Sequence, residues 1–243
     1  MRTLEITIPV LNEEATLSKQ IGTLHSFLDR HFSGQLQFKI VIADNGSSDG
    51  TQRIGELLAK DCPWLNYLRL NERGVGRALK ASWGSSSADF VGYMDLDLAT
   101  DLHHLLQALA ALQEGGYDIV YATRLHPEAS VTGRSMKRSI VSRIFNLILR
   151  DYLDTTFSDG MCGFKFLRRA ILPTLLENGA ASDGWFFSTE LLAVSEWQNF
   201  KIYELPVHWT DDPSSKVRIF PLAMSYLKAM RILRKHRPAI VKP

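Results

Sequence analysis

Short apolar runs alternate with amphipathic stretches through the first half of the chain, and this alternation constrains the fold more than any other feature. Five runs predict strands covered on both faces, because they are apolar almost throughout: Leu4–Val10, Phe38–Ala43, Leu65–Leu70, Phe90–Met94 and Asp118–Ala122. Helical periodicity covers the segments between them: Glu14–Arg30, Gly50–Lys60, Gly76–Ser86 and Asp101–Gln113. This order predicts an α/β fold with a mostly parallel central sheet flanked by helices.

The second half of the chain departs from this regular order. Its expected elements are three helices, a glycine-rich segment, a strand and a basic C-terminal helix: Arg138–Arg150, Arg168–Glu177, Phe187–Trp197, Asp159–Lys165, Phe200–Trp209 and about Pro221 to His236. With 243 residues, 45% of them hydrophobic, the chain can bury a full core. We therefore expect a single domain over residues 1–243.

Composition excludes some classes of protein. A net charge of +2 gives no sign of a nucleic-acid-binding protein. Cys62 and Cys162 lie far apart without metal-ligand spacing, which suggests a reducing compartment. The first residues lack the unbroken apolar stretch of a signal peptide, and no apolar run approaches the roughly 20 residues of a spanning helix. We expect a cytoplasmic protein, soluble or peripherally attached at the cytoplasmic face of a membrane.

Two carboxylates, Asp95 and Asp97, emerge where the apolar run Phe90–Met94 ends. In an extended chain they point the same way, and two like charges held close together repel unless a cation lies between them. Their hard oxygens suit Mg²⁺ or Mn²⁺, whose open positions a diphosphate can fill. Alone, the triplet is weak evidence, since a solvated turn or a helix cap would also use these residues.

Polar segments follow three of the predicted strands: Pro9–Glu14, Asp44–Thr51 and Asp95–Asp97. In open α/β sheets, ligands bind beyond the carboxyl ends of the strands, where loops meet helix N-termini. Each loop also has an ordinary interpretation, because Asn12 and Asp49 are good N-caps and Ser47–Ser48 is common turn chemistry. Three such loops at one edge nevertheless predict a site there.

The same three motifs resemble those of inverting family 2 glycosyltransferases with the A-type, nucleotide-sugar-binding fold. Further motifs, listed together, resemble the polyprenyl-phosphate (dolichyl-phosphate) sugar transferases: Arg124, Arg138 with Ser142, Asp159 with Cys162–Lys165, Trp185–Leu192, Glu204–Trp209 and Ser215–Lys216. The match runs from about residue 5 to 218. The resemblance implies a nucleotide-sugar-binding half (1–125), an acceptor-side half (126–220) and a basic C-terminal helix or tail (221–243).

The resemblance also implies a role for particular residues. Those lining the base and ribose of the donor would be Pro9, Leu11, Glu13 and Asp44, with Gly76 and Leu96 nearby. Asp95 and Asp97 would hold Mg²⁺ or Mn²⁺ and the diphosphate. Four residues would receive the acceptor phosphate or the leaving diphosphate: Arg124, Arg138, Ser142 and Lys216. Asp97, Asp159, Arg138 and Lys216 would be the catalytic residues, and Glu190 would lie on the acceptor side.

Differences from the mannosyl members of this family bear on the donor, and the ionisation of the acceptor bears on the need for a base. Ala99 stands where mannosyl members usually have Gln, and Thr210–Pro213 stands where they tend to carry an Arg. The segments Cys162–Lys165 and Pro206–Trp209 look more like those of the dolichyl-phosphate glucosyltransferases, and this resemblance favours UDP-glucose over GDP-mannose as donor. A phosphate monoester, with a second pKa of about 6, is already largely anionic and needs positioning by Arg and Lys. An alcohol acceptor would need a general base, for which Asp159 or Glu190 could serve.

We therefore expect a metal-dependent, inverting transferase that moves a hexose from a nucleotide-diphosphate sugar to a polyprenyl phosphate. The alternatives are a same-fold transferase acting on a sugar hydroxyl and a non-catalytic nucleotide-sugar-binding protein. Membrane contact is expected from the basic segment Lys228–Arg237, although a solvated tail or a membrane-bound partner would also account for it. The stretch Arg143–Arg150 could lie on a bilayer or face the core.

Overall fold

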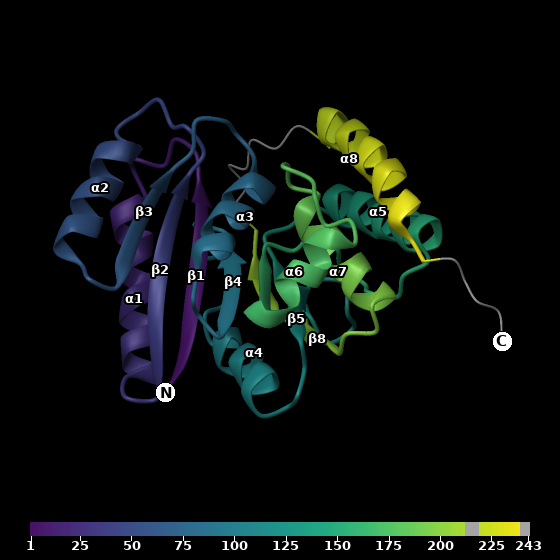
Figure 1. The fold of residues 1–243 in the computed structure, drawn as a ribbon. Helices are drawn as coiled ribbons and strands as arrows, with labels where there is room; N and C mark the ends of the chain where they lie inside the picture. Colours follow the sequence, from purple (N-terminus) through teal and green to yellow (C-terminus); the bar gives the residue numbers. More distant parts are fainter. Residues whose placement is uncertain (212–218, 239–243) are drawn as a thin grey trace.

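The computed structural model of the chain describes residues 1–211 and 219–238 (Figure 1). Its strands are β1 Arg2–Val10, β2 Leu36–Asp44, β3 Leu65–Arg69, β4 Phe90–Met94, β5 Ile119–Thr123, β6 Ser130–Thr132, β7 Phe164–Arg168, β8 Ile202–Pro206 and β9 His208–Thr210. Its α-helices are α1 Leu17–Phe32, α2 Thr51–Asp61, α3 Val75–Ser85, α4 His104–Gln113, α5 Met136–Leu153, α6 Leu172–Glu177, α7 Phe187–Trp197 and α8 Ile219–Leu233.

The described residues form a seven-stranded sheet with the order β3-β2-β1-β4-β7-β5-β8. Parallel pairs join β1 to β2, β1 to β4, β2 to β3 and β5 to β8, whereas β7 is antiparallel to both of its neighbours. The expected mostly parallel sheet is confirmed. In the register of β1 and β2, Val10 lies opposite Asp44, so the loops that follow these strands start side by side.

Helices cover both faces of this sheet (Figure 1). One buried cluster contains side chains of β1, β2, α1 and α4, and a second contains side chains of α3, α5, α6, α7 and α8. The strands are apolar on both faces because each face meets one of these clusters. All four helices expected in the first half are present, and their ends lie within three residues of the expected bounds.

Strand β7 was not expected, and it begins within the segment Asp159–Lys165 that was expected only to be glycine-rich. Residues Phe164–Arg168 pair antiparallel with β4 and with β5, and thus complete the centre of the sheet. Lys165 in an otherwise apolar run obscures the strand pattern, yet its side chain is fully buried. The helix expected at Arg168–Glu177 consequently begins later, at Leu172, after a 3₁₀ turn at Arg169–Ile171.

The single strand expected at Phe200–Trp209 is wrong, because the structure divides it into β8 and β9. β8 ends at Pro206, which has no backbone N–H to continue the ladder. The chain then leaves the main sheet, and β9 pairs with β6 in a separate two-stranded sheet. This change of partner carries Trp209 toward the carboxyl edge, where Thr100 bridges to it.

The basic C-terminal helix is present as α8, followed by a 3₁₀ turn at Arg234–His236. α8 packs beside α5, and the rings of Tyr226 and Phe145 lie 5.5 Å apart between them (Figure 1). Lys216 lies outside the described residues. Among the residues that are described, none of the helices combines the length and apolar character needed to cross a bilayer.

Candidate active site

The loops after β1 and β2 are bonded to each other. The N–H of Asn12 donates to Ser47 Oγ at 2.9 Å, and the N–H of Ser48 donates back to Asn12 Oδ1 at 2.8 Å. The N–H of Gly50 donates to Glu14 Oε2 at 2.7 Å. These reciprocal bonds fix the two loops into one wall at the carboxyl edge of the sheet.

Asp44 ends β2 beneath this wall, and its side chain exposes no surface. It accepts hydrogen bonds from Ser47 Oγ at 2.6 Å, from Tyr67 Oη at 2.5 Å and from Arg69 at 2.9 Å. Burial and the bond to Asp44 raise the pKa of Tyr67 to about 12, so Tyr67 remains a donor. The carboxylate therefore holds the loop and Arg69, and its expected contact with the donor base stays a prediction.

The other expected donor residues lie along the same edge. Leu11 is exposed, whereas Pro9 and Glu13 are half-buried. The N–H of Glu13 donates to Thr51 Oγ1 at 2.8 Å, which joins this segment to the start of α2. An exposed apolar side chain beside anchored backbone is a suitable surface for a planar base.

Asp95 lies directly after β4 and is enclosed by the chain that leads into β7. Its N–H donates to the carbonyl of Gly163 at 3.2 Å. A Cβ on Gly163 would lie 2.0 Å from Asp95 Oδ2, so only glycine leaves room for this carboxylate. Burial first, and then the charge of Asp97, raise the pKa of Asp95 to about 7. The structure thus brings the two carboxylates together, with Leu96 buried between them.

These carboxylates fit a divalent metal. A half-buried carboxylate beside a second one is unfavourable as an anion, and a hard cation removes that cost. Asp97 is exposed, and its Oδ1 accepts the N–H of Ala99 at 3.0 Å. Within residues 1–211 and 219–238, no group of three or more His, Cys, Asp or Glu side chains could hold a metal. Two protein ligands leave coordination positions for substrate oxygens.

Arg124 and Asp159 form a buried ion pair beside Asp95. The guanidinium donates to Asp159 Oδ2 at 2.8 Å and to Oδ1 at 3.1 Å, and it lies 4.8 Å from the ring of Trp209. Burial alone would raise the pKa of Asp159, but the Arg124 guanidinium outweighs burial and holds that pKa below 3.8. An ionised carboxylate with both oxygens engaged positions Arg124, and it is a weak proton acceptor.

Arg138, near the start of α5, donates to Asp211 Oδ2 at 2.9 Å. Burial, followed by the positive charges of Arg124 and Arg138, lowers the pKa of Arg134, which places a third guanidinium in this cluster. One turn after Arg138, Ser142 is buried, and its Oγ has no hydrogen-bond partner among the described residues. The structure thus gathers three cations and an unpartnered hydroxyl at the expected acceptor side.

Lys165 and Arg134 are two cations of this region to which the sequence analysis gave no role. Lys165 Nζ donates to the carbonyls of Cys162 at 2.7 Å and Gly160 at 3.2 Å, and burial lowers its pKa to about 8. The sequence contained a signal for Lys165 in the segment Cys162–Lys165, but gave it no role. For Arg134 the sequence offered only its position before a basic helix.

Glu190 and Gly76 both contact the segment 182–184, which lies against the start of α3. The N–H of Ser182 donates to Glu190 Oε2 at 2.8 Å, and burial raises the pKa of this carboxyl group. The N–H of Gly76 donates to the carbonyl of Gly184 at 3.1 Å, and a Cβ at Gly76 would lie 2.2 Å from the carbonyl of Ser182. Glu190 therefore holds the segment 182–184 against the start of α3.

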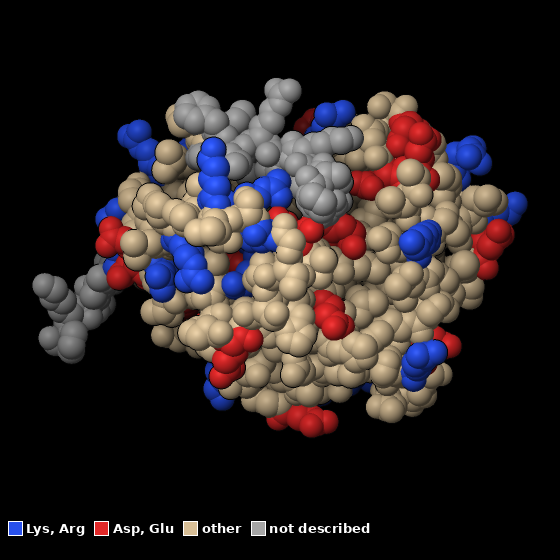
Figure 2. Space-filling view, turned by 180° about the vertical axis from the view of Figure 1, so that it is seen from behind, with Lys and Arg blue, Asp and Glu red and all other residues tan. Residues whose placement is uncertain are grey.

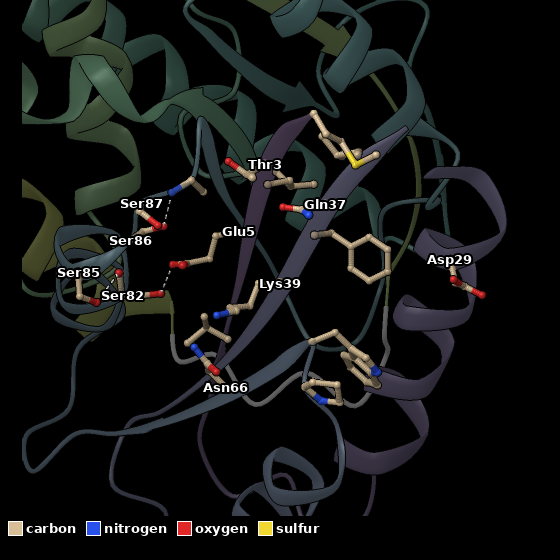
Figure 3. Close-up of a pocket in the computed structure, with 18 of the residues that line it drawn as sticks. Thr3, Glu5, Asp29, Gln37, Lys39, Asn66, Ser82, Ser85, Ser86 and Ser87 are labelled. Carbon is tan, nitrogen blue, oxygen red and sulfur yellow. Dashed lines mark hydrogen bonds between the residues drawn. The ribbon is translucent and has the colours of Figure 1, made fainter. Parts of the chain in front are cut away.

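A hollow of about 850 Å³ lies away from these residues, along β1, β2, β3 and the end of α3 (Figure 3). Figure 3 shows Glu5 pointing toward Ser82, whose Oγ donates to Glu5 Oε1 at 2.8 Å. Ser82 Oγ also shares a hydrogen bond with Thr7 Oγ1 at 2.8 Å. None of the residues expected to bind donor or acceptor lines this hollow.

Comparison with known proteins supplies independent information. The profile of the family described as glycosyl transferase family 2 matches residues 5–176. Glycosyltransferase AglD of Haloferax volcanii is 30% identical over 219 residues, which cover 88% of this chain and 34% of AglD. Dolichyl-phosphate beta-glucosyltransferases of Dictyostelium discoideum and Saccharomyces cerevisiae are 28% and 24% identical, and the alignments cover 93% and 95% of this chain. They cover 72% and 74% of those two relatives.

Among solved structures, the fold is similar to glucosyl-3-phosphoglycerate synthase from Mycobacterium tuberculosis in complex with Mn²⁺, UDP and glucosyl-3-phosphoglycerate. The TM-score is 0.66 at 18% identity, covering 98% of this chain and 82% of that one. At this identity the likeness establishes the fold alone, and it confirms the expected A-type architecture.

Proposed function

The chain belongs to glycosyl transferase family 2, and on this premise we propose that it transfers glucose from UDP-glucose to the phosphate of a polyprenyl phosphate, with inversion. The observation that carries the proposal is the cluster of Arg124, Arg134 and Arg138 with the buried hydroxyl of Ser142. Arg124 joins this cluster to Asp95, the first carboxylate of the Asp95 and Asp97 pair. Carboxylates and guanidinium groups side by side suit a metal-bound diphosphate facing an anionic acceptor.

A phosphate acceptor is favoured over a hydroxyl because neither expected general base is available. Asp159 is ionised and bonded to Arg124, and both carboxylate oxygens of Glu190 accept hydrogen bonds from Ser182. A phosphate monoester, with a second pKa of about 6, attacks as an anion and needs no base. In this proposal Arg138 and Ser142 bind that phosphate, and Asp159 keeps Arg124 oriented. The expected contribution of Lys216 stays a prediction outside the described residues.

Asp95 and Asp97 would hold Mg²⁺ or Mn²⁺ in this proposal. When bound, the metal would stabilise the negative charge that develops on the leaving diphosphate. The protein's own contribution is partial enclosure, because the backbone at Gly163 lies against the Asp95 carboxylate and leaves it half-buried. Low local dielectric strengthens every charge interaction at this position.

The choice of glucose rests on the relatives. Two proteins named dolichyl-phosphate beta-glucosyltransferase align with 93% and 95% of the chain. Ala99 also stands where mannosyl members usually carry Gln. The chain spans only about a third of the length of AglD, so nothing about that relative's whole activity is transferred here.

Acceptor competition tests this function. A short polyprenyl phosphate, the polyprenol of the same length and a soluble glycoside should be offered together with UDP-glucose and Mn²⁺. We expect product only from the polyprenyl phosphate, and at least tenfold less product when GDP-mannose replaces UDP-glucose as donor. Glucosylation of the polyprenol or the glycoside would overturn the proposed acceptor, and preference for GDP-mannose would overturn the proposed donor.

A further inference from the structure

Helix α5 exposes apolar side chains and buries polar ones, the reverse of an ordinary surface helix. Its buried face contains Ser142 and Asn146 together with Leu149 and Leu153. Its outward face carries six apolar side chains, here called the α5 apolar face: Met136 at 81% exposure, Ile140 at 52%, Val141 at 38%, Ile144 at 53%, Leu147 at 58% and Ile148 at 48%. A helix usually turns such a stripe toward the core.

The orientation of α5 is fixed by polar contacts on its inner side. Asn146 Oδ1 accepts the N–H of Gly160 at 2.9 Å, which ties the helix to the loop containing Asp159. Arg138, which is on the same helix as Asn146, donates to Asp211 in the segment after β9. Because these contacts hold the polar side inward, the spacing of the apolar residues by three and four positions leaves one continuous stripe outside. A stripe of this kind marks an interaction surface.

Positive charge borders the α5 apolar face. Lys137 and Arg143 are exposed on α5 itself, and Lys228 and Arg231 are exposed on the adjacent α8. Asp151, near the end of the helix, is its one acidic residue. In Figure 2, blue Lys and Arg side chains lie around tan surface on the side of the molecule that carries α5. An apolar stripe with a basic border is typical of helices that lie in a membrane interface.

We propose that α5 lies on an anionic membrane surface with its apolar face in the boundary between headgroups and acyl chains. The helix has 18 residues and thus offers a contact about 27 Å long. The role given to this docking rests on the proposed function. Arg138 and Ser142 belong to α5, so docking this helix places the proposed acceptor site at the height of the lipid headgroups. A polyprenyl phosphate carries its phosphate at that height.

This surface contains the stretch Arg143–Arg150, one of the two alternatives for which was a place on a bilayer, and it lies beside the basic segment Lys228–Arg237 from which membrane contact was expected. Tyr226, Met230 and Leu233 of α8 face the protein interior, whereas Leu227 of the same helix is 48% exposed. α5 supplies the larger apolar face, and α8 adds its cations together with the exposed side chains of Leu227 and Ile232. A second copy of the chain fits the face less well than a membrane, because a two-fold contact would bring the same basic border against itself.

Binding to protein-free vesicles, without donor or acceptor, tests the proposal. The intact chain should co-sediment with phosphatidylglycerol-containing vesicles at low salt and much less with phosphatidylcholine alone. The double substitution Ile144→Ser with Leu147→Ser should raise the lipid concentration for half-binding roughly tenfold or more. Leu57→Ser is the matched control, because Leu57 is 55% exposed on α2 against 58% for Leu147. It should bind as the unaltered chain does.

The outcomes separate this proposal from its rivals. If the unaltered chain does not bind anionic vesicles at low salt, or if the double variant binds equally well, α5 is not the membrane surface. A dimer in sedimentation velocity that the double substitution dissociates would assign the face to a second copy. Circular dichroism checks that the variant is folded. Transfer to a short polyprenyl phosphate in detergent is measured separately, so a failed vesicle test and a failed proposed function give different results.

Discussion

Gly163→Ala should inactivate the enzyme although Gly163 has no side chain to contact substrate. The added Cβ would lie 2.0 Å from Asp95 Oδ2 and 2.5 Å from Asp95 Cγ, whereas contacts of Cβ below 3.0 Å are essentially never seen. The carboxylate must therefore move by at least 1.0 Å, the difference between 3.0 and 2.0 Å. A displacement of about 1 Å at a catalytic group costs roughly 10²-fold in rate, equivalent to about 2.7 kcal/mol.

The assay is kcat/KM for glucose transfer to a short polyprenyl phosphate, together with calorimetric titration of UDP in the presence of Mn²⁺. Both should weaken in the variant, because the displaced carboxylate belongs to the expected metal site. Gly84→Ala is the matched control, since nothing lies within 4 Å of a Cβ at Gly84. A folded Gly163→Ala protein with unchanged kcat/KM, or a loss equal to that of Gly84→Ala, would refute this reasoning.

Three further predictions concern individual charges. Asp97→Asn should keep the fold and lower turnover by roughly 10²-fold, and full activity of the unaltered enzyme in EDTA would contradict a metal. Arg138→Ala should weaken use of polyprenyl phosphate much more than UDP binding, with Arg53→Ala on α2 as the exposed control; equal losses would assign Arg138 to the donor or the fold. Asp159→Asn leaves Arg124 buried without its counter-charge and should lower the free energy of unfolding by about 3 kcal/mol in urea titrations. Because the pKa of Asp159 is lowered on folding, its contribution is present above about pH 4 and is lost as the pH falls through the folded-state pKa, so the variant should differ least in acid.

The sequence was sufficient for the parts of the fold that depend on local pattern. Apolar runs and helical periodicity located β1 to β5 and the four helices between them, and the carboxyl ends of parallel strands then had to bring Asp44 and Asp95 to one edge. The resemblance directed attention to Arg124 and Arg138, which the structure places in one cluster with Asp159.

What the sequence could not provide depends on long-range pairing. β7 inserts between β4 and β5, and this placement alone brings Lys165 and Gly163 beside Asp95. Nothing near Asp159 in the sequence indicates that Arg124, 35 positions earlier, occupies both of its oxygens. The sequence left open whether Arg143–Arg150 faces a bilayer or the core, and the contacts of Asn146 and Arg138 determine that the apolar side of α5 faces outward.

The most direct test of the central claim is the bond formed in the product. After incubation of the enzyme with UDP-α-glucose, Mn²⁺ and a short polyprenyl phosphate, ¹H and ³¹P NMR should identify a phosphodiester between the anomeric carbon of glucose and the lipid phosphate. Inversion predicts the β-anomer, with its large coupling between H1 and H2. An α-linked product, or glucose attached to a hydroxyl group, would contradict the account.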